Sequence, residues 1–250
     1  MADVKISVDD HSSKNSIMDD FCYNNNVSKS NVYVRLGEYA HIRVRFLRKV
    51  YGILSVQFFL TTVITAITMF TPAAKLYISQ NHWMVTGAFF MALILLVLLM
   101  VKRRQTPTNY ILLTAFTFVQ SYTVAVVVSF YDQMAVLQAF LLTLGVTVGL
   151  TLYTFQSKRD FSTWGAGLYA FLMVLVVGGL LQFVVASSHL ELVLSLAGAA
   201  LFSFFLIFDT HMIMHRVSPE EYILATIELY LDVINLFLHI LRIVGEARRH

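Results

Sequence analysis

Long apolar runs alternate with short polar stretches over most of the chain. Each run is about 20 residues long, which is the length at which an α-helix crosses the ~30 Å hydrocarbon core of a bilayer. Six runs have this character throughout, over residues 50–70, 83–101, 110–130, 134–154, 164–186 and 191–213. The pattern therefore predicts an all-α fold, a polytopic membrane helical bundle.

A seventh apolar run, residues 222–241, differs from the others because polar side chains interrupt it. At about 100° per residue, the polar residues in and beside this run fall on one helix face, within an arc of roughly 60–80°. We call this face the polar stripe, and its members are Glu221, Glu228, Asp232, Asn235, His239 and Arg242.

The polar stripe limits where this last helix can lie. An ionisable group deep in a bilayer costs at least ~2.5–3.5 kcal/mol on insertion scales, so the stripe is not expected to face lipid. The alternatives are a stripe that lines a solvated cytosolic vestibule, an amphipathic helix at the membrane interface, a re-entrant hairpin, and a helix shielded inside the bundle. Apolar residues cover more than half of the circumference, which disfavours the interfacial helix. The sequence predicts seven hydrophobic segments with a polar last helix that is central or re-entrant.

The two ends of the chain are polar. Residues 1–34 are rich in Ser, Asn and Asp and show little apolar periodicity, so we expect a disordered N-terminal tail. Residues 35–245 form the predicted transmembrane helical bundle. Residues 246–250 are expected to form a short basic C-terminal tail.

The positions of Lys and Arg predict the orientation of the bundle, because short basic loops resist translocation. Basic residues precede the first run and follow the second, fourth and sixth runs, whereas the other connections have almost none. The N-terminus is therefore predicted to be cytosolic. Seven crossings would place the C-terminus on the far side, yet Arg242, Arg248 and Arg249 favour the cytosol, so six and seven crossings both stay open.

The composition supports a membrane protein and excludes several other classes. A hydrophobic share of 58% against 13% charged residues, with a mean hydropathy of +0.70, exceeds what a water-soluble core needs. The one cysteine, Cys22, excludes a disulfide framework and a cysteine-based zinc site. Since the net charge of +3 is small and most basic residues lie between the runs, we expect no nucleic-acid partner, and no cofactor is expected either.

Asp209, near the end of the sixth run, and Asp232, in the seventh, are the central candidates for chemistry. If their carboxyl groups meet across two adjacent helices, repulsion and desolvation stop both from ionising near neutral pH, so they share a proton. Such a pair would latch two helices when protonated and release them when the proton is lost. Its oxygens also suit transient contact with a hard cation such as calcium. These residues thus predict a pH-linked gate.

Other polar and small residues have structural interpretations. His211 and His215 are four residues apart, but without a third ligand at a defined spacing we expect them to cap the helix end and not to bind metal. Polar residues of the third and fourth runs could line a pore, but such residues more often form interhelical hydrogen bonds. They are Gln120, Ser121, Thr123 and Gln138. Small residues within the runs are expected to mark close helix contacts. They include Gly145, Gly149, Gly178 and Gly198.

Several motifs resemble the Lifeguard branch of the transmembrane Bax inhibitor motif family. The likeness covers about residues 43–245, and the last two motifs together are highly specific. The motifs are FLRKVYGILSVQ, VVVSFYD, LTLYTFQSKRDFSTWGAGL, LIFDTH and SPEEYILATIELYLDVINLFLHILR.

The resemblance implies a bundle in which the polar C-terminal helix is surrounded by the others, and a pH-sensitive calcium leak from Golgi and endoplasmic reticulum stores that inhibits apoptosis. In bacterial relatives two aspartates on the last two helices form the proton-sensing pair, and Asp209 and Asp232 match them. Acidic residues that match Glu220 and Asp232 are tied to ion conduction in the Golgi members. The arginine that latches the bacterial pair from the second helix has no match before Arg103.

We therefore predict a calcium leak channel, and not an enzyme, in the membrane of the Golgi and also of the endoplasmic reticulum. Asp209 and Asp232 are its expected proton-sensing pair and transient calcium ligands, with His239 and Arg242 as stripe partners. Membrane lipids, calcium and protons are the expected partners. The ion path is expected along Glu220, Glu221, Glu228, Asp232 and Asn235.

Two other functions stay open. A membrane scaffold would regulate apoptosis through Bcl-type or receptor partners, or as a homo-oligomer, with the N-terminal tail as its docking segment. An intramembrane aspartyl protease would use the same two aspartates to activate water. Against the protease, Asp232 follows Leu229, Tyr230 and Leu231 and so lacks the Gly-x-Gly-Asp pattern of that class.

Overall fold

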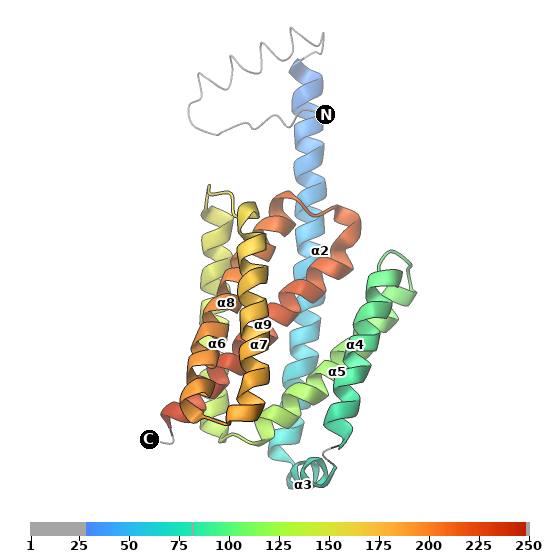
Figure 1. Cartoon of the computed structure of the whole chain (residues 1–250). Helices are drawn as coiled ribbons and strands as arrows, with labels where there is room; N and C mark the ends of the chain where they lie inside the picture. The colour runs from blue at the N-terminus through green and yellow to red at the C-terminus, as the bar shows by residue number, and fades with distance from the viewer. Residues whose placement is uncertain (1–28, 82, 249–250) are drawn as a thin grey trace. The chain divides into compact units, whose positions relative to one another are not determined.

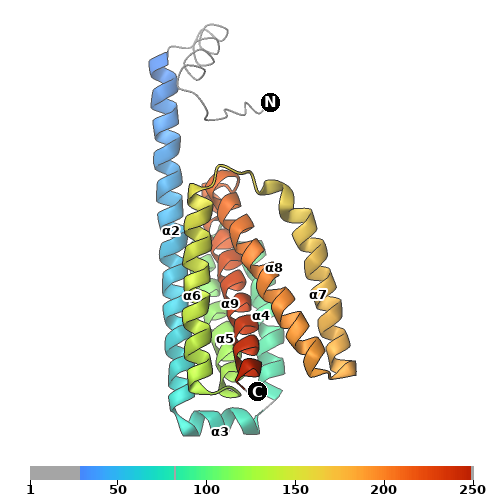
Figure 2. The same cartoon turned by 90° about the vertical axis from the view of Figure 1, so that its left-hand side faces the viewer.

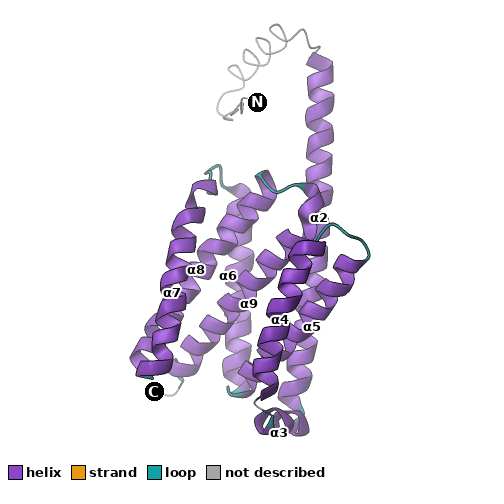
Figure 3. Ribbon diagram, turned by 45° about the vertical axis from the view of Figure 1, so that its right-hand side comes forward, coloured by secondary structure: helices purple, strands orange, loops and turns teal. Residues whose placement is uncertain are grey.

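The computed structural model describes residues 29–81 and 83–248, and this part of the chain is helical, without a strand (Figure 3). Two short 3-10 turns, η1 (Ser162–Trp164) and η2 (Pro219–Glu221), precede α7 and α9. The α-helices are α2 (Lys29–Phe70), α3 (Pro72–Gln80), α4 (Trp83–Lys102), α5 (Thr108–Ser129), α6 (Gln133–Gln156), α7 (Gly165–Val185), α8 (Ser188–His215) and α9 (Tyr222–Ala247). The all-α prediction is confirmed.

The chain divides into two compact units, Met1–Phe46 and Leu47–His250. The described part of the first unit is the beginning of α2. Residues 29–34, which we expected in the disordered N-terminal tail, are helical, whereas residues 1–28 lie outside the described residues. Extending an existing helix needs no new nucleus, which explains how α2 can begin well before its apolar run.

Seven helical stretches of the described chain are long and apolar enough to cross a membrane, as the sequence predicts. Between the first two, the short helix α3 was not anticipated. It begins with Pro72 at its first position, where the missing N–H group costs no intrahelical hydrogen bond. A connection without a long apolar run can therefore still be helical.

Helix α9 lies among the other helices of the second unit (Figures 1 and 2). Helices α8 and α6 pack closely along it, and α5 also contacts it. In α9, 61% of the most apolar stretch is buried, against 6% in the segment that contains α7. Because lipid tails are as apolar as leucine, the hydrophobic effect does not draw an apolar helix inward within a bilayer. The polar stripe explains why α9 is the central helix.

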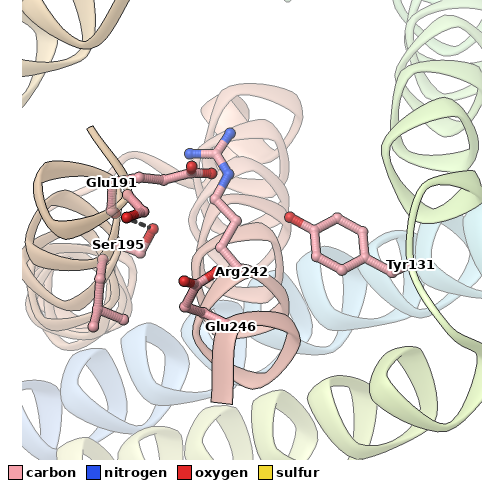
Figure 4. A pocket seen from close by; sticks show the side chains of 7 residues that line it. Tyr131, Glu191, Ser195, Arg242 and Glu246 are labelled. Carbon is pink, nitrogen blue, oxygen red and sulfur yellow. Dashed lines mark hydrogen bonds between the residues drawn. The ribbon is translucent and has the colours of Figure 1, made fainter. Parts of the chain in front are cut away.

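Helix α9 is unbroken, so the re-entrant alternative is wrong. Near its end, Nη1 of Arg248 donates a hydrogen bond of 2.7 Å to Oδ2 of Asp132, in the connection between α5 and α6. One helical turn and a half earlier, Arg242 lies beside Glu191 of α8 (Figure 4). These arginines therefore have acidic neighbours at this end of the bundle.

The small residues in the helices have two different surroundings. A Cβ atom on Gly178 would lie 2.6 Å from a leucine of α8, and one on Gly198 would overlap the ring of His239. Close helix contacts are confirmed at these two positions. The same expectation is wrong for Gly145 and Gly149, because they lie on the exposed surface of α6 and nothing is within 4 Å of either Cβ position.

Candidate functional site

Asp209 of α8 and Asp232 of α9 lie side by side where these two helices pack together. Their carboxyl groups are within hydrogen-bonding reach of each other. Only 6% of Asp232 is exposed, and its Oδ2 atom is buried without a hydrogen-bond partner among the described residues. Two carboxylates this close repel each other strongly in a medium of low polarity, whereas one shared proton turns the repulsion into a hydrogen bond.

Glu228 extends this pair into a group of three carboxyl side chains. It lies one turn before Asp232 on the same face of α9, close enough to Asp209 for their charges to interact. Arg103, just beyond the end of α4, is also within electrostatic range of Glu228. We call Asp209, Glu228 and Asp232 the acidic cluster. A cation that reached it would meet carboxylate oxygens from both α8 and α9.

Glu221 ties the beginning of α9 to the end of α4. Its Oε2 atom lies 2.7 Å from Nε of Arg103, and its Oε1 atom accepts a hydrogen bond of 2.7 Å from Nε of Arg104. The hydrogen bond to Glu221 raises the pKa of the Arg104 guanidinium above its ordinary value. The structure therefore places Glu221, a predicted ion-path residue, in contact with two arginines.

Glu220 and Asn235, also predicted on the ion path, have different surroundings. Glu220 is exposed in η2, where its backbone N–H faces the hydroxyl of Ser218. Asn235 donates a hydrogen bond of 2.8 Å from Nδ2 to the carbonyl of Leu231 in its own helix. The polar stripe is thus not a uniform row of side chains directed at one path.

The last two members of the polar stripe lie about 10 Å or more along α9 from Asp232. His239 stacks on Phe202 of α8, with 5.6 Å between ring centroids and 23° between ring planes, and its Nδ1 atom is buried without a partner among the described residues. Arg242 is exposed and lines a small pocket of about 30 Å³ together with Glu191 (Figure 4). The structure does not bring these two side chains to the acidic cluster.

A buried network of hydroxyl and amide groups lies on the side of α9 opposite Asp232. The hydroxyl of Tyr230 is 2.8 Å from Oγ1 of Thr61 in α2, which in turn is 3.0 Å from Oγ of Ser121 in α5. Nε2 of Gln57 donates a hydrogen bond of 2.9 Å to Oγ1 of Thr117. An interhelical bond is confirmed for Ser121, and the network joins α2, α5 and α9. Thr123, in contrast, donates its hydroxyl hydrogen bond to the carbonyl of Val119 in its own helix.

His211 has a carboxylate partner that the sequence did not suggest. Its Nε2 atom lies 3.1 Å from Oδ1 of Asp160, in the connection between α6 and α7, and Nη2 of Arg216 lies 3.6 Å from Oδ2. Hydrogen bonds from Ser162 and then His211 hold the pKa of the Asp160 carboxyl well below its usual range.

The ring of His215 is 4.6 Å from that of His211. Among the described residues, no three His, Cys, Asp or Glu side chains converge as a metal site.

Sequence reasoning missed both Arg103 and Asp160 as partners of the site. Each lies in a connection between helices, where helical periodicity carries no information about neighbours. The sequence contains one feature that points to such a partner. It is Glu221, an acidic residue before the last helix, whose charge calls for a basic partner from a nearby connection. Only the tertiary structure, which brings the connection after α4 to the beginning of α9, identifies that partner as Arg103 and its neighbour.

Comparison with known proteins agrees with the motif resemblance. A family model described as inhibitor of apoptosis-promoting Bax1 matches residues 43–249. The Golgi anti-apoptotic protein of vaccinia virus (strain Lister) is 46% identical over 234 residues, which cover 94% of this chain and 95% of the viral protein. Protein lifeguard 4 of Mus musculus is 46% identical over 236 residues, covering 94% and 96%. Bax inhibitor 1 of Schizosaccharomyces pombe is 40% identical over 210 residues, covering 84% and 79%.

Proposed function

Because the chain belongs to the family of inhibitors of apoptosis-promoting Bax1, we propose that it inhibits apoptosis from the Golgi membrane, and also from the membrane of the endoplasmic reticulum. The Golgi assignment is supported by the name of the viral relative. Inhibition of apoptosis is supported by the description of the family and by the name of the viral relative.

The proposed activity is a calcium leak along α8 and α9. The observation that carries this proposal is the acidic cluster: carboxyl groups inside a membrane bundle are costly and therefore call for a function. Carboxylate oxygens are ligands that calcium prefers, and two carboxyl groups without a closed coordination shell suit a passing ion better than a resident one. Calcium is thus the transported substrate and not a cofactor.

The proposed gate is the shared proton between Asp209 and Asp232. With the proton in place, the hydrogen bond between the carboxyl groups holds α8 against α9. Loss of the proton leaves two negative charges that repel each other and attract a cation. Calcium efflux is therefore expected to rise as the pH is raised.

The orientation proposed for the leak follows the distribution of basic residues. A cytosolic N-terminus places the connections that contain Arg103 and Asp160 on the cytosolic side. Glu220 and Glu221, at the beginning of α9, then stand at the cytosolic mouth. Stored calcium would pass from the lumen toward this mouth and lower the calcium content of the store.

The test is calcium efflux from proteoliposomes that contain the purified full-length protein, measured over a range of pH. Asp232→Asn keeps the shape of the side chain and a hydrogen bond to Asp209 but cannot share a proton with it. Its efflux should therefore be low, with a weaker pH response than that of the wild type. Asp132→Asn, which changes an acidic residue outside the acidic cluster, is the matched control and should retain the pH response.

An Asp232→Asn protein that leaks at the wild-type rate with the wild-type pH response would refute the gate. If liposomes that contain the wild-type protein retain calcium at every pH, the result would favour the membrane scaffold over the calcium leak. In that case deletion of residues 1–34 should abolish protection of cells from apoptosis. Cleavage of a helical membrane peptide that Asp209→Ala abolishes would instead favour the protease.

A further inference from the structure

A long apolar groove runs between α2 and α6, with a volume of about 940 Å³. It extends from Tyr51 and Phe155 at one end to Phe70 and Met134 at the other, so it follows these two helices over most of their apolar length. The rings of Tyr51 and Phe155 pack edge to face at their end of the groove, with 5.9 Å between centroids. The groove therefore has a defined end and a direction parallel to the helices.

The groove opens sideways toward lipid. On its two rims Phe59 of α2 is 67% exposed and Leu144 of α6 is 50% exposed. Its floor contains buried residues of α9, including Val233 and Phe237. Empty space beside apolar side chains loses dispersion contacts, and acyl chains are the molecules that the bilayer core supplies to fill it.

Charged residues lie beyond both ends of the groove. Arg48 lies one turn before Tyr51, and Lys158 and Arg159 follow the end of α6 closely after Phe155; all three are exposed. At the opposite end, Asp132 precedes α6 and is already paired with Arg248. The positive charge at the Tyr51 end complements an anionic headgroup, because basic side chains at the membrane surface attract anionic lipids.

We propose that this groove binds an acyl chain of an anionic phospholipid, whose headgroup lies at Arg48, Lys158 and Arg159, and that the bound chain braces α9. The bound chain would contact α9 directly, because residues of α9 form the floor of the groove. One of them, Val233, directly follows Asp232 in the sequence. A chain that fills the groove limits the sideways movement of α9 away from α8. The binding stands independently, whereas its effect on calcium flux rests on the proposed function.

The binding is tested by native mass spectrometry of the full-length protein, with palmitoyl-oleoyl phosphatidylserine and phosphatidylcholine as probes. The wild type should retain phosphatidylserine several-fold better than phosphatidylcholine. Ala66→Phe places a ring inside the groove and should reduce retention of both lipids several-fold. Ala170→Phe, on the exposed surface of α7, is the matched control and should bind as the wild type does.

A variant with Arg48→Gln, Lys158→Gln and Arg159→Gln tests the headgroup without altering the groove. It changes only exposed side chains, so it remains informative if Ala66→Phe fails to fold. This variant should retain the two lipids equally. Lys102→Gln is the control at the same end of the bundle and should keep the preference.

Equal lipid retention by the wild type, folded Ala66→Phe and the triple variant would overturn the lipid site. A dimer in the wild type that Ala66→Phe abolishes, with lipid retention unchanged, would assign the groove to a second copy of the chain. Calcium efflux tests the lipid site and the calcium leak separately. Efflux through the wild type should differ between liposomes with and without phosphatidylserine, whereas efflux through Ala66→Phe should be the same in both. Absence of all efflux would refute the calcium leak while the retention data still decide the lipid site.

Discussion

The imidazole ring of His239 in α9 lies against Gly198 in α8, in a position where the glycine has no room for a side chain. The ring also stacks on Phe202, one turn further along α8. This contact allows α8 and α9 to approach closely, and the same two helices bring Asp209 and Asp232 together.

Gly198→Ala is therefore expected to destabilise the protein. The added methyl group overlaps the His239 ring, and inserting a methyl group into a packed interior costs about 1–3 kcal/mol. Thermal unfolding in detergent measures the change. Gly149→Ala is the control, because its Cβ position is open, and it should leave the unfolding temperature unchanged or slightly raised. Combining Gly198→Ala with His239→Ala should recover part of the loss; no recovery would show that the ring is not the obstacle.

Glu221→Gln should loosen the beginning of α9. The substitution removes the charge that Arg103 and Arg104 share, and a hydrogen bond to a charged group is roughly twice as strong as one between neutral groups. Since both arginines are partly exposed, the advantage of the wild type should shrink as salt is added. The control is Glu220→Gln, which changes the exposed residue beside Glu221 and should unfold at the wild-type temperature. If both variants lost the same amount of stability, the ion pairs of Glu221 would not be the cause.

Asp160→Asn tests the contact between the α6–α7 connection and α8. The folded protein holds the pKa of Asp160 below its usual range, so the ionised group adds stability above about pH 4, its unfolded-state value, and this stability is lost as the pH falls further. The variant should thus unfold at a lower temperature than the wild type at pH 7, and the gap should narrow at pH 3. A gap that stays constant over this range would contradict the assignment.

Tyr230→Phe removes the hydroxyl group that bonds α9 to Thr61 of α2. Hydrogen bonds between membrane helices contribute about 0.6 kcal/mol on average, so the expected loss is small but measurable. Tyr169→Phe removes a hydroxyl group from the exposed face of α7 and should have no effect on unfolding. A double-mutant cycle with Thr61→Val distinguishes the bond itself from a general loss of packing.

Much of the candidate site was predictable because its signals are local. Carboxyl groups inside apolar runs are rare and costly, so Asp209, Glu228 and Asp232 stand out without knowledge of the fold. The partners of these residues are not local. Asp160 and His211 are 51 residues apart, and Arg104 and Glu221 are 117 apart. No periodic pattern connects residues at such separations, so their pairing was missed.

The seven spans, the all-α class and the single polar face of the last helix follow from the order of residues alone. Each depends on the length of an apolar run or on the 3.6-residue period, which are properties of one segment. Which faces meet was decided by packing. Gly198 admits a ring from α9 whereas Gly149 faces outward, and α9 is one unbroken helix among the surrounding helices. Which helix faces pack together depends on the shape of side chains from segments that are distant in sequence. These side chains contact one another, and so contribute to stability, only in the folded bundle.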